Sequence, residues 1–480
     1  MSFLRTWFRT PRVRRGLAAS AIILSAGGLV LARTPAGAQT TLGGSTLLVA
    51  AGSNSATFSG RGAHGSFSLS HGSVLAGAEQ PVFAELDLRA DAADRARERA
   101  PLSIAVVLDT SGSMSGEKII QAKEAVIALI RDLRDDDEIA FVRYAGDSEL
   151  VQPLARAGAV RSSLIGRVQA IEASGGTSIA PALAQGLRAL DDAGRGRVKR
   201  VVLASDGLDG TRAQSEAIAR QSAGRGVTVS SMGIGLDFDE SYMGSVAKAG
   251  HGNFAFVKDG AALTAFLQRE LVETATTTIE AATARITLPV GVRFVRAIGA
   301  DARPIEGGRE IELSLGSLFA GDERRVIVEL AASIGAGDLR AFEGTVAWSN
   351  VGGDGSQARF AGVSLQGTTD VLAVNASRDG NVLAHATSAL ASIRQIEAAQ
   401  AYAQGDTGRA QAIIDRNVAE LAAAATAAPA AAATSLQNQA AEFEQTRKTF
   451  AAAPPKSAAG NAAAKRAVER NMSNEARSVF

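Results

Sequence analysis

Residues 102–114 of the chain read LSIAVVLDTSGSM. The first seven of these residues are apolar apart from Ser103, which is typical of a strand covered on both faces of a parallel sheet. Asp109 then begins a short run of Thr, Ser and Gly, which are turn-forming residues. In an open parallel sheet, ligands bind outside the carboxyl ends of the strands. The stretch therefore predicts a central strand of an α/β sheet and a polar loop at the binding edge of that sheet.

Strand-like and helix-like segments alternate from residue 102 to about residue 270. The helix-like segment 116–133 repeats apolar residues at helical spacing, whereas 200–205 is a short apolar run. Strands that alternate with helices are typical of a doubly wound α/β fold of the Rossmann type. We therefore expect one such domain over 99–272, with further strands at 138–144, 227–233 and 254–257 and further helices at 160–171, 179–190, 211–222 and 261–271.

The segments on both sides of this domain alternate apolar and polar residues. Examples are 82–88 in the N-terminal β segment, 39–98, and 310–313 in the segment 273–370. Such alternation predicts strands with one buried face, and the intervening Gly and Asp residues predict turns. We expect a β-sandwich-like domain over 273–370, with 39–98 as a candidate to pack against it.

Beyond residue 370 the pattern becomes helical. Two runs of helical spacing surround Gly405-Asp406 and predict a helical hairpin over 371–425. The last segment, 426–480, is rich in Ala, is interrupted by prolines and contains few large apolar residues. We expect this segment to be a largely disordered tail with a weak helix at 436–450.

The first 38 residues have the composition of an export signal. Five arginines within residues 5–15 precede an uncharged run of 17 residues, 16–32, and then Ala36-Gly37-Ala38, a small-residue cleavage motif. We expect 1–38 to be a signal peptide, so that the chain is exported to the periplasm or cell surface of a bacterium. Arg14-Arg15 also fits the twin-arginine route. The alternative is an uncleaved anchor, although 17 residues is a short span, and no later segment is apolar enough to cross a membrane.

Composition excludes several classes of protein. The 50 basic and 49 acidic residues give a net charge of +1, so there is no general electrostatic reason to bind nucleic acid or an anionic membrane. The absence of Cys excludes disulfides, thiolate metal sites and a cysteine nucleophile. The four His residues are too scattered for an HExxH metalloprotease motif.

Five oxygen-bearing side chains fall at the expected binding edge of the sheet. Asp109, Ser111 and Ser113 follow the first strand, Thr177 stands just before a predicted helix, and Asp206 follows another predicted strand. Hydroxyl and carboxylate oxygens are ligands for hard divalent cations. The sequence therefore predicts a cation site, with Mg²⁺ as the first choice and Mn²⁺ or Ca²⁺ as alternatives.

The three motifs that carry these side chains form a known pattern. Asp109–Met114, Gly175–Thr177 and Ser205–Gly207, in this order and spacing, resemble the metal-ion-dependent adhesion site of a von Willebrand factor A domain. The resemblance covers about 101–270. The wider layout resembles secreted bacterial proteins that are similar to inter-alpha-trypsin inhibitor heavy chains and to calcium-activated chloride channel-like proteins.

The resemblance implies a role for each side chain. The residues that match Ser111 and Ser113 bind the metal directly in that family, the one that matches Thr177 binds directly or through water, and those that match Asp109 and Asp206 act mainly through water. One coordination position is left for an Asp or Glu carboxylate of a partner protein. With only two charged groups, both expected outside the inner shell, the ion keeps most of its positive charge for such a ligand.

These points predict an exported binding protein and not an enzyme. The first alternative is a self-associating structural component of an envelope complex, and the second is a metal-dependent hydrolase. A serine nucleophile is disfavoured because the chain has no G-x-S-x-G elbow and because His251 is the only His within 101–270. D-x-S-x-S alone is also a common turn sequence, so the prediction depends on all three motifs together. One departure from the family pattern is Asp209, where Asn is frequent.

Overall fold

The computed structural model describes residues 53–92, 100–206, 209–235 and 238–477. All of them belong to the unit that spans 45–480. The predicted signal peptide, 1–38, lies outside the described residues. Within the described ranges, every helix is too short or too polar to cross a membrane.

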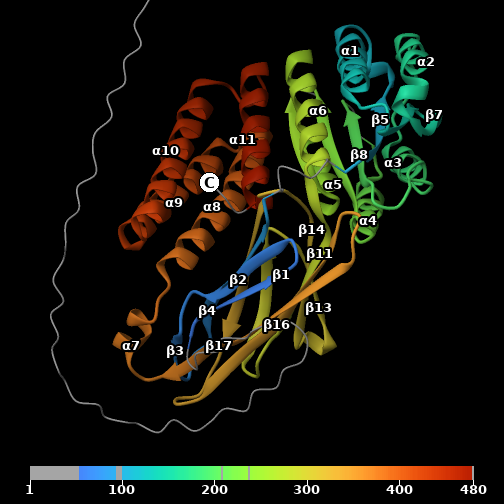
Figure 1. Cartoon of the computed structure of the whole chain (residues 1–480). Helices are drawn as coiled ribbons and strands as arrows, with labels where there is room; N and C mark the ends of the chain where they lie inside the picture. The colour runs from blue at the N-terminus through green and yellow to red at the C-terminus, as the bar shows by residue number, and fades with distance from the viewer. Residues whose placement is uncertain (1–52, 93–99, 207–208, 236–237, 478–480) are drawn as a thin grey trace, which may run out of the picture. The chain divides into compact units, whose positions relative to one another are not determined.

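The predicted α/β domain is built on a six-stranded sheet (Figure 1). The strand order is β10-β9-β8-β5-β6-β7, and every neighbouring pair is parallel except β6 and β7. The antiparallel edge strand β7 was not predicted. The strands are β5 (Leu102–Asp109), β6 (Glu138–Tyr144), β7 (Ser148–Arg156), β8 (Val198–Ser205), β9 (Val227–Ile234) and β10 (His251–Val257).

Helices cover both faces of this sheet. Ile104, Val106 and Leu108 of β5 pack with α1, α2 and α6, whereas Ala105 and Val107 pack with α3, α4 and α5. The alternate residues of one strand thus enter two separate cores, which explains its unbroken apolar run. The doubly wound fold is confirmed. The helices are α1 (Glu117–Asp132), α2 (Ala157–Gln169), α3 (Ile179–Arg188), α4 (Arg212–Ala223), α5 (Glu240–Ala249) and α6 (Gly260–Ala275).

A β-sandwich is formed by strands from both sides of the α/β domain. One sheet has the order β1-β2-β4-β15-β12 and the other β13-β14-β11-β16-β17-β3, and the two share one apolar core. The strands are β1 (Ser55–Gly60), β2 (Ala63–Leu69), β3 (Ser73–Leu75), β4 (Gln80–Ala90), β11 (Thr277–Thr287), β12 (Val292–Ile298), β13 (Asp301–Ile305), β14 (Glu310–Phe319), β15 (Glu323–Ala332), β16 (Leu339–Asn350) and β17 (Gly355–Thr368), with a short 3₁₀ helix at Glu306–Gly308.

The sandwich is therefore not contiguous in sequence. Strand β4 pairs antiparallel with β15 along its whole length, from Gln80 opposite Ala332 to Arg89 opposite Glu323. The α/β domain leaves the sandwich after β4 and returns to it where α6 runs into β11. The predicted β-sandwich-like domain over 273–370 is thus only part of the sandwich, because the N-terminal β segment supplies central strands of one sheet.

The C-terminal region is helical throughout its described length. The predicted hairpin is present as α8 (Gly380–Gln404) and α9 (Thr407–Ala427), after a short α7 (Val371–Ala376). Gly405 ends α8 in the left-handed conformation that favours glycine, with φ of 94°. The prediction of a largely disordered tail over 426–480 is wrong, since α10 (Ala430–Ala452) and α11 (Ala458–Arg477) pack with α8 and α9 (Figure 1).

Small side chains explain this difference. Ala has the highest helix propensity, and here Ala463, Ala464 and Ala467 of α11 are buried in the helical core. Aromatic anchors close that core, with Tyr402 and Phe450 stacked at a centroid distance of 3.9 Å. The Ala-rich composition thus allows close helix packing once a partner helix is present, although it contains little of the bulky apolar pattern that predicts a core.

Candidate metal centre

The loop after β5 is held by hydrogen bonds to its neighbours. Thr110 donates from both its backbone N and its Oγ1 to the carbonyl oxygen of Tyr144, at 2.7 and 2.9 Å, which ties the loop to the end of β6. Oδ1 of Asp109 accepts from the backbone N of Ser111 at 2.8 Å. A 3₁₀ turn, Gly112–Met114, follows and leads into α1. The two serine hydroxyls are thereby turned toward one another.

Four of the five predicted side chains lie at this edge in a network of hydrogen bonds. The Oγ atoms of Ser111 and Ser113 are 3.0 Å apart. Ser113 Oγ donates to Oδ1 of Asp206, the residue that follows β8, at 2.7 Å. Asp109 and Ser111 are buried, whereas Ser113 is exposed. The network therefore runs from the interior of the domain to its surface.

Thr177 lies in the adjacent loop and does not join the hydrogen-bonded network. Two backbone hydrogen bonds hold its loop against the loop of Asp109, from Ser174 N to the carbonyl oxygen of Thr110 at 2.7 Å and from Gly112 N to that of Gly175 at 3.0 Å. Gly175 has φ of 83°, a conformation that favours glycine. Among the described residues, the half-buried Thr177 hydroxyl has no hydrogen-bond partner.

Each oxygen of the two carboxylates accepts a hydrogen bond from the protein. Asp109 accepts from Ser111 N and, at 2.8 Å, from Ser205 Oγ, while Asp206 accepts from Ser113 Oγ and, at 2.5 Å, from Lys118 Nζ. Burial raises the pKa of Asp109 and the charge of Asp206 adds to the rise, whereas the hydrogen bonds from Ser111 and Ser205 oppose it. The two carboxylates are thus anchored behind the hydroxyl groups.

Two side chains that bond the carboxylates of this site were not predicted. Ser205 was noted only as part of a motif, and its hydroxyl bonds Asp109. Lys118 forms an ion pair with Asp206 from the first turn of α1. A cation near a helix N-terminus is unfavourable because of the helix dipole. A lysine in the first turn of a predicted helix therefore indicates an acidic partner from another segment, and this signal was present in the sequence.

Asp209, the departure from the family pattern, has a local structural role. It accepts hydrogen bonds from the backbone N of Ile179 at 2.6 Å and from Tyr242 OH at 2.9 Å. Burial opposes its ionisation, but the bonds from Ile179, Thr211 and Tyr242 outweigh burial and lower its pKa. Asp209 thus fixes the start of α3, which follows the loop of Thr177.

The donor set fits a small hard cation. In an octahedral shell with metal–oxygen distances of 2.0–2.1 Å, neighbouring oxygens lie about 2.9 Å apart, and with Ca²⁺ distances they lie about 3.3–3.7 Å apart. The two hydroxyls Ser111 Oγ and Ser113 Oγ are hydrogen-bonded at 3.0 Å, a separation compatible with neighbouring ligands in the smaller shell. Within the described ranges, no three His, Asp or Glu side chains are grouped to hold a metal.

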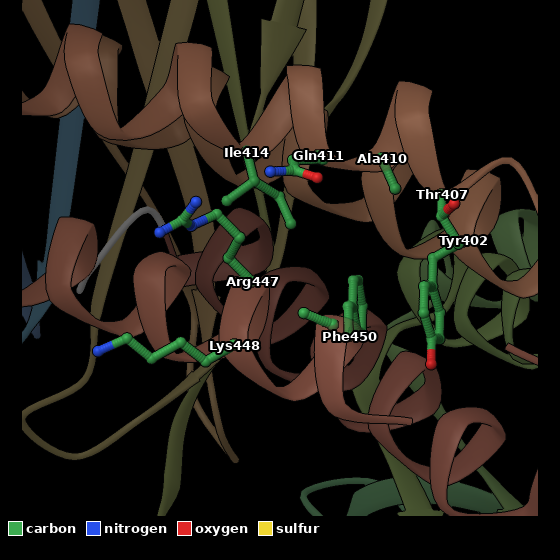
Figure 2. Close-up of a pocket in the computed structure, with 9 residues that line it drawn as sticks. Tyr402, Thr407, Ala410, Gln411, Ile414, Arg447, Lys448 and Phe450 are labelled. Atoms are coloured by element: carbon green, nitrogen blue, oxygen red, sulfur yellow. The ribbon is translucent and has the colours of Figure 1, made fainter. Parts of the chain in front are cut away.

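A cavity in the helical region has a different character. About 190 Å³ in volume, it lies between α9 and α10 beside the Tyr402–Phe450 stack (Figure 2). Its nine lining residues include Ile414 and Arg447 but no carboxylate and no histidine. Arg447 pairs with Glu444 at 2.5 Å. This cavity therefore offers apolar surface and is not a cation site.

Comparison with known proteins agrees with the fold. Residues 103–269 match the family described as von Willebrand factor type A domain. The uncharacterized protein YfbK of Escherichia coli (strain K12) is 28% identical over 264 residues, which cover 52% of this chain and 45% of that protein. Inter-alpha-trypsin inhibitor heavy chain H3 of Homo sapiens is 40% identical over 47 residues, or 10% of this chain and 5% of that protein. The chain thus spans less than half the length of these relatives.

A solved structure extends the similarity beyond the α/β domain. A von Willebrand factor type A protein from Catenulispora acidiphila aligns with 85% of this chain and 91% of its own, at a TM-score of 0.65 and 20% identity. At that identity the likeness concerns the fold alone. The match to the family and the shared fold lead to one conclusion: residues 103–269 of this chain form a von Willebrand factor type A (VWA) domain.

Proposed function

We propose that this protein binds a divalent cation, Mg²⁺ first, and through it a carboxylate of a partner protein. Ser111, Ser113 and Thr177 would supply the inner oxygens, and Asp109 and Asp206 would act from behind them. VWA domains are generally metal-dependent protein-interaction modules. The proposal assigns that general activity to these five residues.

The hydrogen-bond network around the two carboxylates is the observation that carries the proposal. A hydroxyl that donates to a carboxylate keeps its lone pairs for a cation, and Ser113 donates to Asp206 in this way. Because no carboxylate needs to touch the ion, its positive charge stays available to an incoming ligand. Such a site suits the holding of a partner's Asp or Glu.

The same surroundings favour binding over hydrolysis. Metal-assisted hydrolysis needs a general base next to an activated water. The side chains that bond the two carboxylates are serines and Lys118, and none of them is an obvious base at neutral pH. His251, the only His of this domain, begins β10 and bonds Ser314 of the sandwich at 2.9 Å. We therefore propose a binding protein.

The N-terminal composition supports a location outside the cytoplasm. With residues 1–38 as an export signal, the VWA domain would meet its partner in the periplasm or at the cell surface, where free Mg²⁺ can occupy the site. Either the general or the twin-arginine route would deliver the chain there.

The first test is direct cation binding by the full chain. Mn²⁺ would be titrated into wild type, Asp109→Ala and Asp135→Ala, with the free ion measured by electron paramagnetic resonance. Asp135 is a matched control, because its carboxylate is 82% exposed and pairs only with a surface arginine, Arg161. We expect one site in wild type and in Asp135→Ala, and an affinity about 10- to 100-fold lower in Asp109→Ala, since a carboxylate behind the hydroxyls is lost.

The second test concerns the partner. Immobilised protein would be exposed to a cell-envelope extract in Mg²⁺, in EDTA, and with Asp109→Ala in Mg²⁺. A protein retained only by wild type in Mg²⁺, and released by an excess of acetate, would support binding through a carboxylate. Absence of any Mn²⁺ site in wild type would overturn the proposal. Retention of the same proteins in EDTA and by Asp109→Ala would also overturn it.

A further inference from the structure

Lys118 is held tightly beside the candidate cation site. Its Nζ lies 2.5 Å from Oδ2 of Asp206, whose side chain is fully buried, while 26% of the Lys118 side chain is exposed. A Cβ atom at Gly235, just after β9, would lie 2.9 Å from Lys118 Cε. The ammonium is therefore confined between the ends of β8 and β9, while part of the Lys118 side chain is exposed.

Lys118 places a positive charge directly beside the hydroxyl network of the site. Its Nζ bonds Asp206, and Asp206 is linked through Ser113 and Ser111 to Asp109. A divalent cation on these hydroxyls would be repelled by the ammonium, whereas an anion bound to that cation would be attracted by it. Lys118 thus strengthens the attraction that a cation bound here exerts on an anion.

We propose that Lys118 has opposite effects on the two affinities of the site: it weakens the binding of the divalent cation and strengthens the binding of the partner's carboxylate. The inference rests on the proposed function of the same site. The ammonium repels the cation but attracts a carboxylate that arrives at the cation's open position. Removal of the charge should therefore move the two affinities in opposite directions.

A purely structural role for Lys118 makes a different prediction. If Lys118 only oriented Asp206 through a hydrogen bond, loss of Lys118 would weaken cation binding and carboxylate binding together. Lys118→Gln separates the two roles, because a glutamine amide also donates to a carboxylate but carries no charge. Lys118→Met removes both the charge and the donor, and Lys118→Arg retains both.

The experiment uses the full chain and two small probes. Mn²⁺ affinity would be measured in chloride buffer by electron paramagnetic resonance. Acetate would then be titrated into the Mn²⁺-loaded protein, and its binding followed by the loss of water-proton relaxation as it displaces metal-bound water. For Lys118→Gln and Lys118→Met we expect Mn²⁺ to bind about tenfold more tightly and acetate about tenfold more weakly, since charges this close interact by more than RT. Lys118→Arg should resemble wild type in both.

The outcomes separate the inference from the proposed function. If wild type binds Mn²⁺ but Lys118→Gln leaves both affinities unchanged, or lowers both, the inference is wrong and the cation site remains. If wild type binds no Mn²⁺, the proposed function itself fails. Should Lys118→Met not fold, as judged by circular dichroism, Lys118→Gln alone decides, because it keeps a donor for the buried carboxylate.

Discussion

Two polar clusters with buried carboxylates occupy opposite ends of the VWA sheet, and they differ in their access to solvent. At the end opposite to the cation site, Glu270 of α6 accepts from Arg200 at 2.5 Å, from Ser230 at 2.5 Å and from Asn253 at 2.6 Å. Arg200 also lies 3.8 Å from the neighbouring Glu273, and among the described residues its Nε has no hydrogen-bond partner. This cluster is closed to solvent, because Arg200 and Glu270 are both buried.

The cluster at the carboxyl ends of the strands is open by comparison. Asp109 and Asp206 are buried, whereas Ser113, whose hydroxyl donates to Asp206, is exposed. An ion from solvent can therefore approach this hydroxyl without entering the interior. The comparison teaches that the closed cluster serves stability, whereas the open one is suited to an external cation.

The largest effect is expected from a substitution that disrupts the closed cluster. Glu270→Ala leaves Arg200 buried without its main partner, so we expect the free energy of unfolding of the VWA domain to fall by about 3–5 kcal/mol. Hydrogen exchange of peptides from β5 and β8 measures this domain by itself. The control is Glu216→Ala, which removes the exposed pair with Arg212 and should cost less than about 1 kcal/mol. Equal losses in the two variants would contradict the distinction between buried and exposed pairs.

The next effect depends on the open cluster. At about 100 times its dissociation constant, Mg²⁺ should raise the unfolding free energy of wild type by about 2.7 kcal/mol, since it binds the folded state alone. Glu270→Ala should gain the same amount, because the two clusters share no side chain and distant effects add. Asp109→Ala, with about 10- to 100-fold weaker binding, should gain only about 0.4–1.4 kcal/mol. The same hydrogen exchange in Mg²⁺ and in EDTA tests both statements, and a gain in Asp109→Ala equal to that of wild type would contradict them.

The smallest effect concerns a carboxylate outside both clusters. Burial raises the pKa of Glu280, on β11, to about 7, although Lys199 opposes the rise. Between its ordinary value of 4.5 and pH 7, the folded state retains a proton that the unfolded state releases, so stability falls as the pH rises through this window. Glu280→Gln should therefore be more stable than wild type by about 1–3 kcal/mol at pH 8, and equal to it at pH 4.

Chemical denaturation followed by circular dichroism at pH 4 and pH 8 checks this last prediction. The result sharpens the comparison, because Glu280 is a half-buried carboxylate whose pKa is raised by burial and only partly lowered by Lys199. A difference that persists at pH 4 would mean that the substitution acts through packing and not through the charge.

The fold was predictable where local pattern and final environment agree. The apolar run at 102–108 and the helical spacing at 116–133 correspond to β5 and α1, because both elements bury the faces that their sequences mark as apolar. Strand β7 was missed because it is an edge strand with few buried side chains, so it shows little alternation. The predicted helix at 436–450 lies within α10, but the full length of α10 and the whole of α11 were missed because their core consists largely of alanine.

The candidate site was predictable in its members but not in its contacts. Each predicted residue follows a strand or precedes a helix, and parallel strands bring such residues to one edge. The ion pair of Lys118 with Asp206 and the bond of Ser205 to Asp109 link segments about 90 residues apart, and no periodicity in the chain encodes them.

The sequence by itself determined that this chain contains a doubly wound α/β domain with an oxygen-rich loop set at its binding edge. These features follow from periodicity and turn chemistry, which act over a few neighbouring residues. Only the tertiary structure decided that β4 pairs with β15 across the inserted VWA domain, and that the ammonium of Lys118 stands beside the buried Asp206. Such pairings depend on packing between distant segments, where burial and charge balance select partners that local pattern does not specify.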